Sequence, residues 1–447
     1  MKKSLLWLLI MLLTVSMVVT FSLAGCKKEE VAEEEAVEEE VAEEEVVEEE
    51  AVEEEVAEAS GEVLYWSYEP NDQKYVDLFN QTHPNIQVKH VSMGPWDLED
   101  KLLTAIASGK GAPDVTMVIA RRFQRFAMGT GMLDITDYVG DKRNDFMTEA
   151  FNMGTYKDRV FAITGRVCPV VMHYRYDLFE EYGLELPKTF QDLSKIQEKL
   201  PEGVYTLPIF YPGAHWGAEW FRGLLQLNGG GIFDENGKFI QNNTTAVEVL
   251  TWIKNLVDSG IGYPVKWFEP EMYTEVKDGK VVMWITNIAE LANFKAMYPD
   301  MAGQWSCAPI PLWDEGSAAL TFTWGNEAFA IPAQAKNPDA AYVFIDWLNT
   351  SSDALDLVSS DGFVPGYKPY LETSEKLKQP DEYLAGGVVL NDVVMSREIA
   401  PFNFIDWIYT SKILGEALDA MFGGEKTPEE AWAYVEQRAA EEMLGTQ

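Results

Sequence analysis

The sequence is poor in three kinds of residue that often define a function. Its 447 residues include only 3 cysteines and 4 histidines, and 35 lysines and arginines against 73 aspartates and glutamates. Three cysteines are too few for a disulfide scaffold. The histidines His83, His90, His173 and His215 lack the spacing of metal ligands. A chain with a net charge of −38 and no basic stripe is not expected to bind nucleic acid.

The first 25 residues have the layout of a secretory signal peptide. Lys2 and Lys3 precede a long apolar stretch, which ends in Leu-Ala-Gly directly before Cys26. These residues resemble the bacterial lipobox, in which the signal is cut before the cysteine and the cysteine is acylated. The stretch is also long enough for an uncleaved membrane helix, but the small residues next to the cysteine favour cleavage. We therefore predict a signal peptide over residues 1–25 and a lipid anchor at Cys26, since two or more acyl chains hold a protein stably at a membrane.

Residues 26–60 are predicted to form a disordered acidic spacer. Between Glu29 and Glu58 the chain repeats Val-Ala-Glu-Glu-Glu and close variants, with a period of five. This period builds no continuous apolar stripe on a helix, which argues against a coiled coil. The 18 glutamates of the segment repel one another, so we expect an extended chain that holds the rest of the protein away from the membrane.

The remaining residues, 61–447, begin with alternating strand and helix patterns. Buried strands are predicted at 63–66, 86–91 and 115–119, and helices with one apolar face at 73–81 and 96–108. This order predicts an α/β fold with a parallel sheet, in which ligands bind beyond the carboxyl ends of the strands. Aromatic residues and hydrogen-bond donors follow each of the three strands.

Seven segments of this region, in their order along the chain, resemble the family-one solute-binding proteins of bacterial sugar ABC importers, the group of the maltose-binding protein. They read LFNQTHPNIQV, LLTAIASGKGAPDV, GMLDITDYV, VVMHYRYDLFEEYGLELPKTFQDL, DGKVVMWITN, NPDAAYVFIDWLNTSSDAL and GFVPGY. Two departures from the family pattern, at Tyr174-Arg175-Tyr176-Asp177 and at FAITGR, lie where the resemblance places the cleft or the hinge.

The resemblance implies a two-lobe periplasmic-binding-protein fold of type II, with the ligand gripped between lobes that are joined by crossing segments. Lobe I would comprise residues 61–167 and 304–352, and lobe II residues 168–303 and 353–447. It further implies a non-catalytic extracytoplasmic receptor that delivers a sugar to ABC transporter permease subunits. We expect a monomer without a cofactor or metal.

A sugar-binding cleft needs flat aromatic rings for the apolar face of the sugar and planar polar groups for its hydroxyls. The residues that we expect to bind the ligand are Trp66, Tyr68, Glu69, Trp96, Arg121, Trp216, Trp220, Trp284, Asn287, Trp324 and Gly325. Trp216, Trp284 and Trp324 are expected to carry most of the affinity, without being needed for folding. Any single tryptophan could instead be a packing residue, as we expect for Trp252 and Trp347. Arg121 could equally form an ion pair, and Asn71 or Asp72 could cap the first helix.

The resemblance also places Cys168 and Cys307 on the two crossing segments. Neighbouring thiols at that position would be able to form a disulfide in an exported protein. Two buried free cysteines are the alternative.

Two other functions stay open at this point. One is a receptor for another polar solute, such as a polyol or a glycerophosphodiester. The other is a surface-tethered glycosidase, which requires two carboxylates on either side of the scissile bond. Glu69, Glu219, Glu290 and Glu327 are available, but no motif pairs any two of them.

Overall fold

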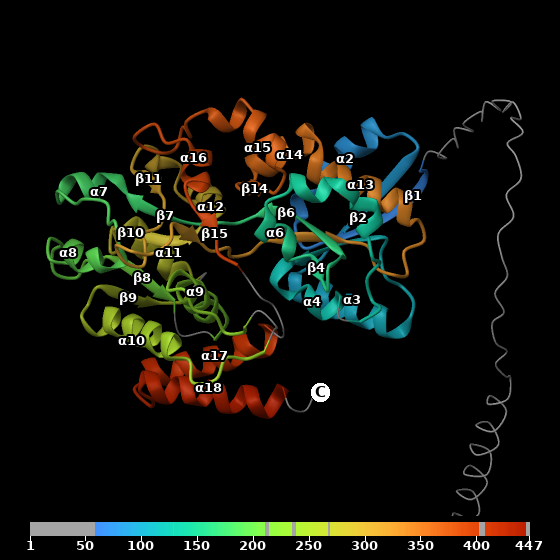
Figure 1. The fold of residues 1–447 in the computed structure, drawn as a ribbon. Helices are drawn as coiled ribbons and strands as arrows, with labels where there is room; N and C mark the ends of the chain where they lie inside the picture. Colours follow the sequence, from blue (N-terminus) through green and yellow to red (C-terminus); the bar gives the residue numbers. More distant parts are fainter. Residues whose placement is uncertain are drawn as a thin grey trace, which may run out of the picture. The chain divides into compact units, whose positions relative to one another are not determined.

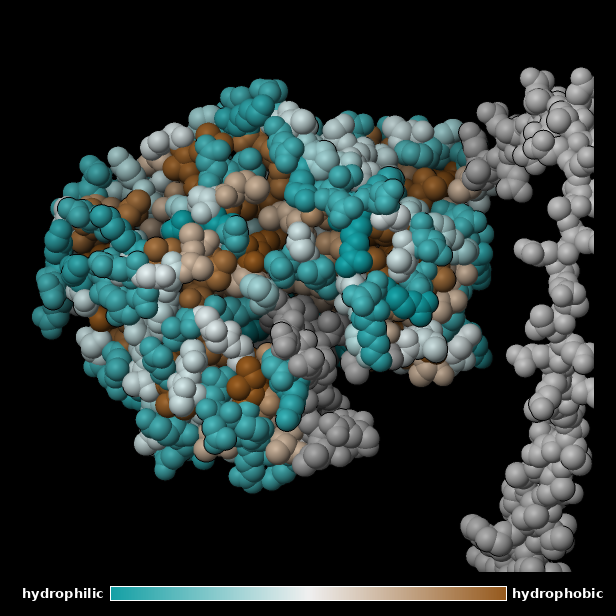
Figure 2. All heavy atoms as spheres, in the orientation of Figure 1, coloured by the Kyte–Doolittle hydropathy of each residue, from teal (hydrophilic) through white to brown (hydrophobic). Residues whose placement is uncertain are grey.

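The computed structural model describes residues 59–127, 129–210, 214–234, 238–266, 269–401 and 407–443. All of them belong to the unit Glu58–Gln447 (Figure 1), and Cys26 and nearly all of the acidic spacer lie outside the described residues. Within the described part, no helix has the length and apolar character needed to span a bilayer. The face shown in Figure 2 is mostly hydrophilic, as expected for a chain in which 24% of the residues are charged.

A six-stranded sheet forms the centre of the first lobe. The strands lie in the order β14-β6-β13-β3-β1-β2. β1 pairs in parallel with β2 and β3, whereas β13 runs antiparallel to β3 and β6. Their bounds are β1 (Gly61–Ser67), β2 (Ile86–Ser92), β3 (Val115–Ile119), β6 (Ala162–Val167), β13 (Glu327–Ala330) and β14 (Val364–Pro365). The predicted parallel start of the sheet is confirmed.

The helices of this lobe pack against the sheet and against one another through aromatic side chains. Phe344 meets Tyr65 of β1 edge to face, with ring centroids 5.3 Å apart. Phe79 meets Phe344 and Trp347 edge to face, with ring centroids 4.9 and 5.4 Å apart, so the packing role predicted for Trp347 is confirmed. The helices and minor strands of this lobe are α2 (Gln73–Thr82), α3 (Pro95–Ser108), α4 (Gln124–Ala127), α5 (Thr136–Val139), α6 (Thr148–Asn152), β4 (Thr155–Tyr156), β5 (Arg159–Val160), α13 (Pro338–Thr350), α14 (Ser352–Ser360) and α15 (Lys368–Thr373).

The second lobe is built around the sheet β10-β7-β11 and the parallel pair β8-β9. Its strands are β7 (Val170–Arg175), β8 (Leu207–Phe210), β9 (Gly262–Val265), β10 (Met283–Asn287), β11 (Trp305–Ala308), β12 (Leu320–Thr321) and β15 (Glu398–Ile399). Its helices are α7 (Tyr176–Glu181), α8 (Leu193–Gln197), α9 (Ala214–Leu227), α10 (Thr244–Asp258), α11 (Pro270–Lys277), α12 (Glu290–Met297), α16 (Leu390–Met395), α17 (Trp407–Phe422) and α18 (Pro428–Met443). α17 lies against both α9 and α18 (Figure 1).

Two of the three segments that cross between the lobes lie side by side. The residues between β6 and β7 run antiparallel to those between β12 and β13. Val170 N donates to Phe322 O at 2.8 Å, and Trp324 N donates to Cys168 O at 2.9 Å. The chain therefore returns to the first lobe near residue 324.

The observed strand pairing and core show that two predicted domain boundaries are wrong. β11, which was assigned to lobe I from residue 304, pairs with β7 in the sheet of the second lobe. Residues 353–373 were assigned to lobe II. However, β14 completes the first sheet, and Leu355, Val358 and Tyr370 belong to the core of the first lobe.

The predicted hinge pair of cysteines is also wrong. Both cysteines are buried and free, and Cys307 lies opposite His173 in the register of β11 and β7. The partner of Cys168 at the crossing is instead the segment after β12, where Asn326 Oδ1 accepts a 2.7 Å hydrogen bond from the Cys168 amide. The family resemblance had placed Cys307 on the second crossing segment, whereas this residue lies in β11 of the second sheet.

Gly223 is a position in α9 where a larger residue should destabilise the protein. A Cβ atom there would approach the ring of Phe322 to 2.2 Å. Alanine is normally about 1 kcal/mol better than glycine inside a helix, but overpacking a core costs about 1 to 3 kcal/mol. We expect Gly223→Ala to lower the free energy of unfolding by about 1 to 2 kcal/mol, measured by urea denaturation of residues 26–447 with Cys26→Ser (the unacylated mature chain). Gly129→Ala is the control, because a Cβ there meets nothing within 4 Å. Equal or greater stability of Gly223→Ala would contradict the packing described.

Glu290 should make stability depend on pH. It lies at the start of α12 and is 2% exposed, and burial raises the pKa of its carboxyl from 4.5 to about 7. Between these values the folded protein keeps a proton that the unfolded chain releases, so the free energy of unfolding falls as pH rises. We expect Glu290→Gln to remove a loss of about 2 to 3 kcal/mol between pH 5 and pH 8. Urea unfolding at the two pH values measures this loss. Glu180→Gln, at an exposed position, should leave the pH dependence of the wild type unchanged. An unaltered pH dependence in Glu290→Gln would refute the assignment.

Candidate functional site

The topology brings chemically active side chains to one edge of the first sheet. Tyr68 and Glu69 follow the carboxyl end of β1, and Arg121 follows that of β3. β13 is antiparallel to β3 and pairs its first residue, Glu327, with Ile119, so it starts where β3 ends. Segments far apart in the sequence thereby meet where the chain crosses to the second lobe (Figure 1).

A buried ion cluster lies at this edge. Arg166, near the end of β6, is 2% exposed, and its guanidinium donates to Asp72 Oδ1 at 2.8 Å and to Glu327 Oε2 at 2.9 Å. Tyr65 donates its hydroxyl proton to the other oxygen of Asp72 at 2.6 Å. The guanidinium carbon also lies 4.6 Å from the ring centre of Tyr75. Asp72 therefore serves as an ion-pair partner, and its side chain does not cap α2.

The carboxylates at this edge influence one another. Burial raises the pKa of Glu327, as do the neighbouring Glu69 and Asp72, while Arg166 opposes the rise. The pKa of the Tyr68 hydroxyl is raised by burial and by Glu327 and Glu69. The same charges act on the hinge, because burial and then Glu327 raise the pKa of the Cys168 thiol. The first lobe thus presents a set of interacting acidic groups beside the crossing segments.

A second ion cluster spans the two lobes. Arg121 Nε of the first lobe forms an ion pair with Glu219 on α9, and both side chains are buried. Arg222, one turn further along α9, lies with its Nε 3.3 Å from the other oxygen of Glu219 and donates to Thr323 O at 2.7 Å. Arg121 is therefore held in an ion pair, which was the alternative to its predicted role in the cleft.

Trp96 is the exposed aromatic residue of this region. Its side chain is 51% exposed, and the guanidinium of Arg122 lies 4.5 Å from its ring centre. Arg122 is positioned by Glu99, with Nη2 and Oε2 3.0 Å apart, and Arg125 binds the other oxygen of Glu99 at 2.6 Å. The indole is held against a fixed cation, with which it shares a cation–π interaction.

The loop between Thr323 and Glu327 links the ion clusters to the hinge. Gly325 has a φ of 92°, which side chains other than hydrogen rarely tolerate. Asn326 binds the Cys168 amide, and its own carbonyl accepts from the amide of Ala120 at 2.9 Å. The positive φ at this position of the loop explains why residue 325 is a glycine, independently of any contact with a ligand.

Several predicted ligand tryptophans lie in the interior. Trp284 is 0% and Trp324 1% exposed, and their rings lie 6.1 and 5.9 Å from that of Phe210. Trp220 is buried as well, and its ring packs in the second-lobe core, 6.4 Å from Trp252. The packing role predicted for Trp252 agrees with this contact.

The structure describes the side chains of two of the other predicted ligand residues, Trp66 and Asn287. Trp66 is buried in β1, with Lys101 Nζ 4.4 Å from its ring centre. Asn287 ends β10 and its side chain accepts from the amide of Glu290 at 3.2 Å. Trp216 belongs to α9, but its side chain lies outside the described residues.

Arg166 and Arg222 are the residues that sequence reasoning missed. A signal for Arg166 existed, since a lone charge inside the apolar strand AITGRV requires a buried partner. Of the two departures from the family pattern, the one at FAITGR lies at the hinge, as expected. The departure at Arg175 does not, because Arg175 binds Asp177 at 2.6 Å and the carbonyl of Lys277 at 3.0 Å, within the second lobe.

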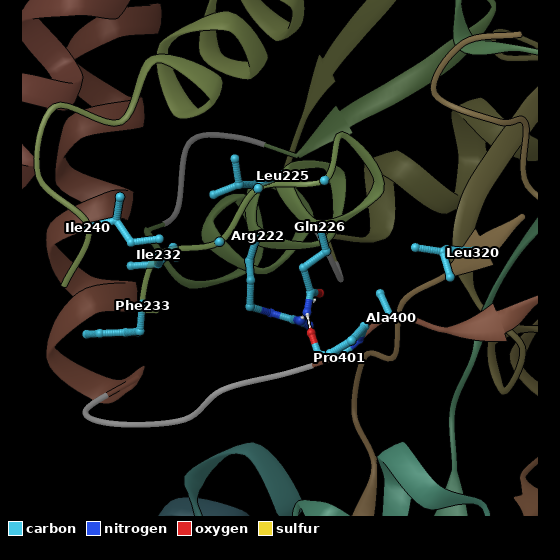
Figure 3. A pocket seen from close by; sticks show the side chains of 12 residues that line it. Arg222, Leu225, Gln226, Ile232, Phe233, Ile240, Leu320, Ala400 and Pro401 are labelled. Atoms are coloured by element: carbon cyan, nitrogen blue, oxygen red, sulfur yellow. Dashed lines mark hydrogen bonds between the residues drawn. The ribbon is translucent and has the colours of Figure 1, made fainter. Parts of the chain in front are cut away.

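A pocket of about 310 Å³ lies on the second lobe, and Arg222 of the second ion cluster lines it. Figure 3 shows Arg222 and Gln226 pointing towards Pro401, whose carbonyl accepts a hydrogen bond from Gln226. The opposite wall is apolar, with Leu225, Ile232 and other aliphatic side chains. Among the residues that the structure describes, no group of acidic, histidine or cysteine side chains could hold a metal ion.

Comparisons with known proteins identify the group to which the chain is related. The arabinooligosaccharide-binding protein of Bacillus subtilis is 25% identical over 397 residues, which cover 83% of this chain and 90% of that protein. The galacto-N-biose-/lacto-N-biose I-binding protein of the ABC transporter from Bifidobacterium longum, solved in complex with lacto-N-biose, matches with a TM-score of 0.75 at 21% identity. The match covers 87% of this chain and 98% of the Bifidobacterium chain. The sugar-binding protein MalE from Xanthomonas citri gives a TM-score of 0.74 at 18% identity, over 87% and 100% of the two chains.

These structural likenesses confirm the predicted two-lobe fold of type II. A family model described as bacterial extracellular solute-binding protein matches residues 74–384, which is most of the chain. The protein therefore belongs to the bacterial extracellular solute-binding proteins.

Proposed function

We propose that this protein is a non-catalytic, lipid-anchored receptor that binds a sugar or oligosaccharide between its lobes and delivers it to the permease subunits of an ABC transporter. The observation that carries the proposal is the ion pair between Arg121 of the first lobe and Glu219 of the second, with Tyr68 close to Arg121 at the edge of the first sheet. These planar polar groups have the fixed geometry that sugar hydroxyls require. The relatives that bind arabinooligosaccharides and lacto-N-biose support a sugar as the ligand.

The positions of the acidic residues support a receptor more than a glycosidase. Hydrolysis needs an acid and a nucleophile or base that face the same bond. Glu219 is bound by two arginines and Glu327 by Arg166, while Glu290 contacts Tyr273 of α11 and Asn293 of its own helix. Each of these three carboxylates is thus held by side chains of the protein itself.

The proposal can be tested by a thermal-shift screen of the unacylated mature chain. A ligand that binds the folded form raises the melting temperature according to RT ln(1 + [L]/Kd). The panel should hold arabinooligosaccharides, maltotriose, lacto-N-biose, polyols and glycerophosphocholine. We expect at least one neutral sugar to stabilise the chain and to be recovered unchanged. A shift with a polyol or with glycerophosphocholine alone would favour the other solute classes, and cleavage of the sugar would favour the glycosidase.

A matched pair of variants locates the site. Tyr68→Ala should weaken binding of the sugar at least tenfold, as measured by isothermal titration calorimetry, because an aromatic anchor in a closed site contributes about 2 kcal/mol. Tyr138→Ala, at an exposed tyrosine of α5 whose ring lies 4.8 Å from that of Tyr342, is the control. Equal affinities of the two variants would place the ligand elsewhere.

Cys26 is predicted to fix the protein to the membrane. In Cys26→Ser the acceptor of the acyl chains is lost, so we expect the protein to appear in the soluble fraction or to keep its signal peptide uncut. The measurement is fractionation of cells that express the full chain, followed by mass determination of its amino terminus. A variant that is still processed and still membrane-bound would disprove the anchor, and Ser60→Ala is a matched control outside the lipobox.

A further inference from the structure

The polar face of α9 leads from the lobe junction to the pocket on the second lobe. Glu219, Arg222 and Gln226 are spaced three and four residues apart, so they lie on one face of the helix. Glu219 forms the ion pair with Arg121 of the first lobe, whereas Gln226 lines the pocket. One row of side chains therefore joins the two places.

The three side chains of this row also contact one another. Arg222 Nε lies 3.3 Å from Glu219 Oε2, and Arg222 Nη1 donates to Gln226 Oε1 at 2.6 Å. Gln226 in turn donates to the carbonyl of Pro401 (Figure 3). The row is therefore held in position from the junction to the wall of the pocket.

Gln226 keeps hydrogen-bonding capacity that the described part of the protein does not use. A glutamine side chain can donate two hydrogen bonds and accept two. Among the described residues, Gln226 donates one to Pro401 and accepts one from Arg222. Because the side chain is partly exposed and lines the pocket, one donor and one acceptor position remain for the hydroxyl groups of a ligand.

The pocket also has the apolar surface that a sugar ring requires. In Figure 3, Ile232 and Ile240 lie on one side of Arg222 and Gln226, and Leu320 lies on the other. A sugar ring presents C–H groups on its faces and hydroxyls at its rim, so it fits a site with apolar walls and a few polar groups. The volume of about 310 Å³ is at the lower end of the range of small-molecule sites, about 300 to 1,000 Å³. The pocket is therefore suited to one sugar unit rather than to a whole oligosaccharide.

The pocket is too far from the interlobe ion pair to be filled by the same sugar unit. Gln226 follows Glu219 by seven residues. This spacing corresponds to about 10 Å along the helix axis, or about two sugar rings in a row. A unit beside Glu219 and a unit beside Gln226 therefore occupy different positions along one glycan, with a further unit between them.

We propose that this pocket is a second sugar subsite, which binds one unit of an oligosaccharide whose other end lies at the lobe junction. This inference rests on the proposed function and narrows the ligand to glycans of three or more units. Gln226 binds hydroxyl groups of the outer unit, while Ile232, Ile240 and Leu320 cover its apolar faces. Because Arg222 already holds Gln226 in position, the side chain loses little conformational freedom when the sugar binds.

The first test measures how the affinity depends on the length of the glycan. Arabinooligosaccharides and maltooligosaccharides, from the disaccharide to the hexasaccharide, are titrated calorimetrically into the unacylated mature chain. In the series that binds, we expect a trisaccharide or longer sugar to have a Kd at least tenfold lower than that of the disaccharide, because only the longer chains reach the pocket. Equal Kd values along the series would overturn the inference.

The same titrations separate this inference from the receptor proposal, with lacto-N-biose as a further disaccharide. If a disaccharide binds as tightly as every longer sugar, or if lacto-N-biose alone binds, a sugar receptor remains in place but the second subsite is refuted. If no sugar of the panel binds, the receptor proposal fails and this inference falls with it.

The second test fills the pocket with a larger side chain. Leu320→Trp places an indole there, so the Kd of the disaccharide and that of the longer sugars should become nearly equal. Leu312→Trp is the matched control, because it is the same substitution at a partly exposed leucine of the same lobe that lines a different pocket. It should keep the Kd ratio of the wild type. An unchanged ratio in Leu320→Trp, or an equal loss in Leu312→Trp, would show that the pocket holds no sugar unit.

A second variant decides if Leu320→Trp does not fold, as judged by circular dichroism. Gln226→Ala removes the polar contact and leaves the apolar walls in place, so the same Kd ratio should fall by about threefold or more, as expected for the loss of a hydrogen bond. Gln437→Ala, at an exposed glutamine of α18, should keep the ratio of the wild type. A folded Gln226→Ala chain with an unchanged ratio would refute the inference.

Discussion

Arg166→Met is expected to lower the free energy of unfolding of the unacylated mature chain by about 3 to 5 kcal/mol, since removal of one partner of a buried ion pair leaves charges that nothing compensates. Two carboxylates, those of Asp72 and Glu327, lose their cation together. Urea denaturation at pH 7 measures the loss. Lys142→Met is the control, because Lys142 forms an exposed pair with Asp346 whose removal should cost at most about 1 kcal/mol.

The loss in Arg166→Met should be recovered in part by removing the charges that it leaves behind. The triple variant with Asp72→Asn and Glu327→Gln replaces an uncompensated pair of anions by neutral groups of similar shape. A buried ion pair that is replaced as a whole is often nearly neutral for stability. If Arg166→Met lost less than about 1 kcal/mol, or if the triple variant were less stable than the single one, the cluster would not have the role described.

Trp284→Ala is expected to cost about 3 to 5 kcal/mol of stability, which is the usual range for truncating a large aromatic residue in a core. Trp284 is fully buried in β10, and its ring lies 5.2 Å from that of Phe294. Thermal and urea unfolding measure the effect, and Trp96→Ala, at 51% exposure, should cost much less.

This expectation revises what the sequence suggested for the same residue. Trp284 was predicted to bind the sugar without being needed for folding. Its burial makes loss of stability the first effect of truncation, and Trp324 is buried in the same way. A Trp284→Ala chain with the stability of the wild type and a sugar affinity reduced tenfold would restore the original prediction.

The regular elements of the first lobe could be predicted because local patterns determine them. β3 lies at residues 115–119, as predicted from an uninterrupted apolar run, and α2 ends within one residue of its predicted bound. Both elements bury one continuous set of side chains, which the periodicity of the sequence records. The parallel order of β1, β2 and β3 follows from the helices between them.

The pairing of distant residues could not be predicted, because nothing local encodes it. Trp305–Ala308 and the residues after β12 are both short apolar segments, and only the register with β7 places the first inside the second sheet. The contact between Arg166 and Glu327 joins residues 161 positions apart. Similarly, no periodicity distinguishes Trp220, which faces the core, from a tryptophan that faces a ligand.

The two hydrogen-bonded crossing segments restrict how the lobes can move. A single connecting strand would permit twisting and sliding as well as bending. Because Val170 and Cys168 are bonded to Phe322 and Trp324, sliding of one segment along the other would break both hydrogen bonds, whereas bending the two together keeps them. Two of the three crossings therefore form a two-stranded ribbon, which favours hinge motion over shear, and the third crossing is the chain between α15 and α16.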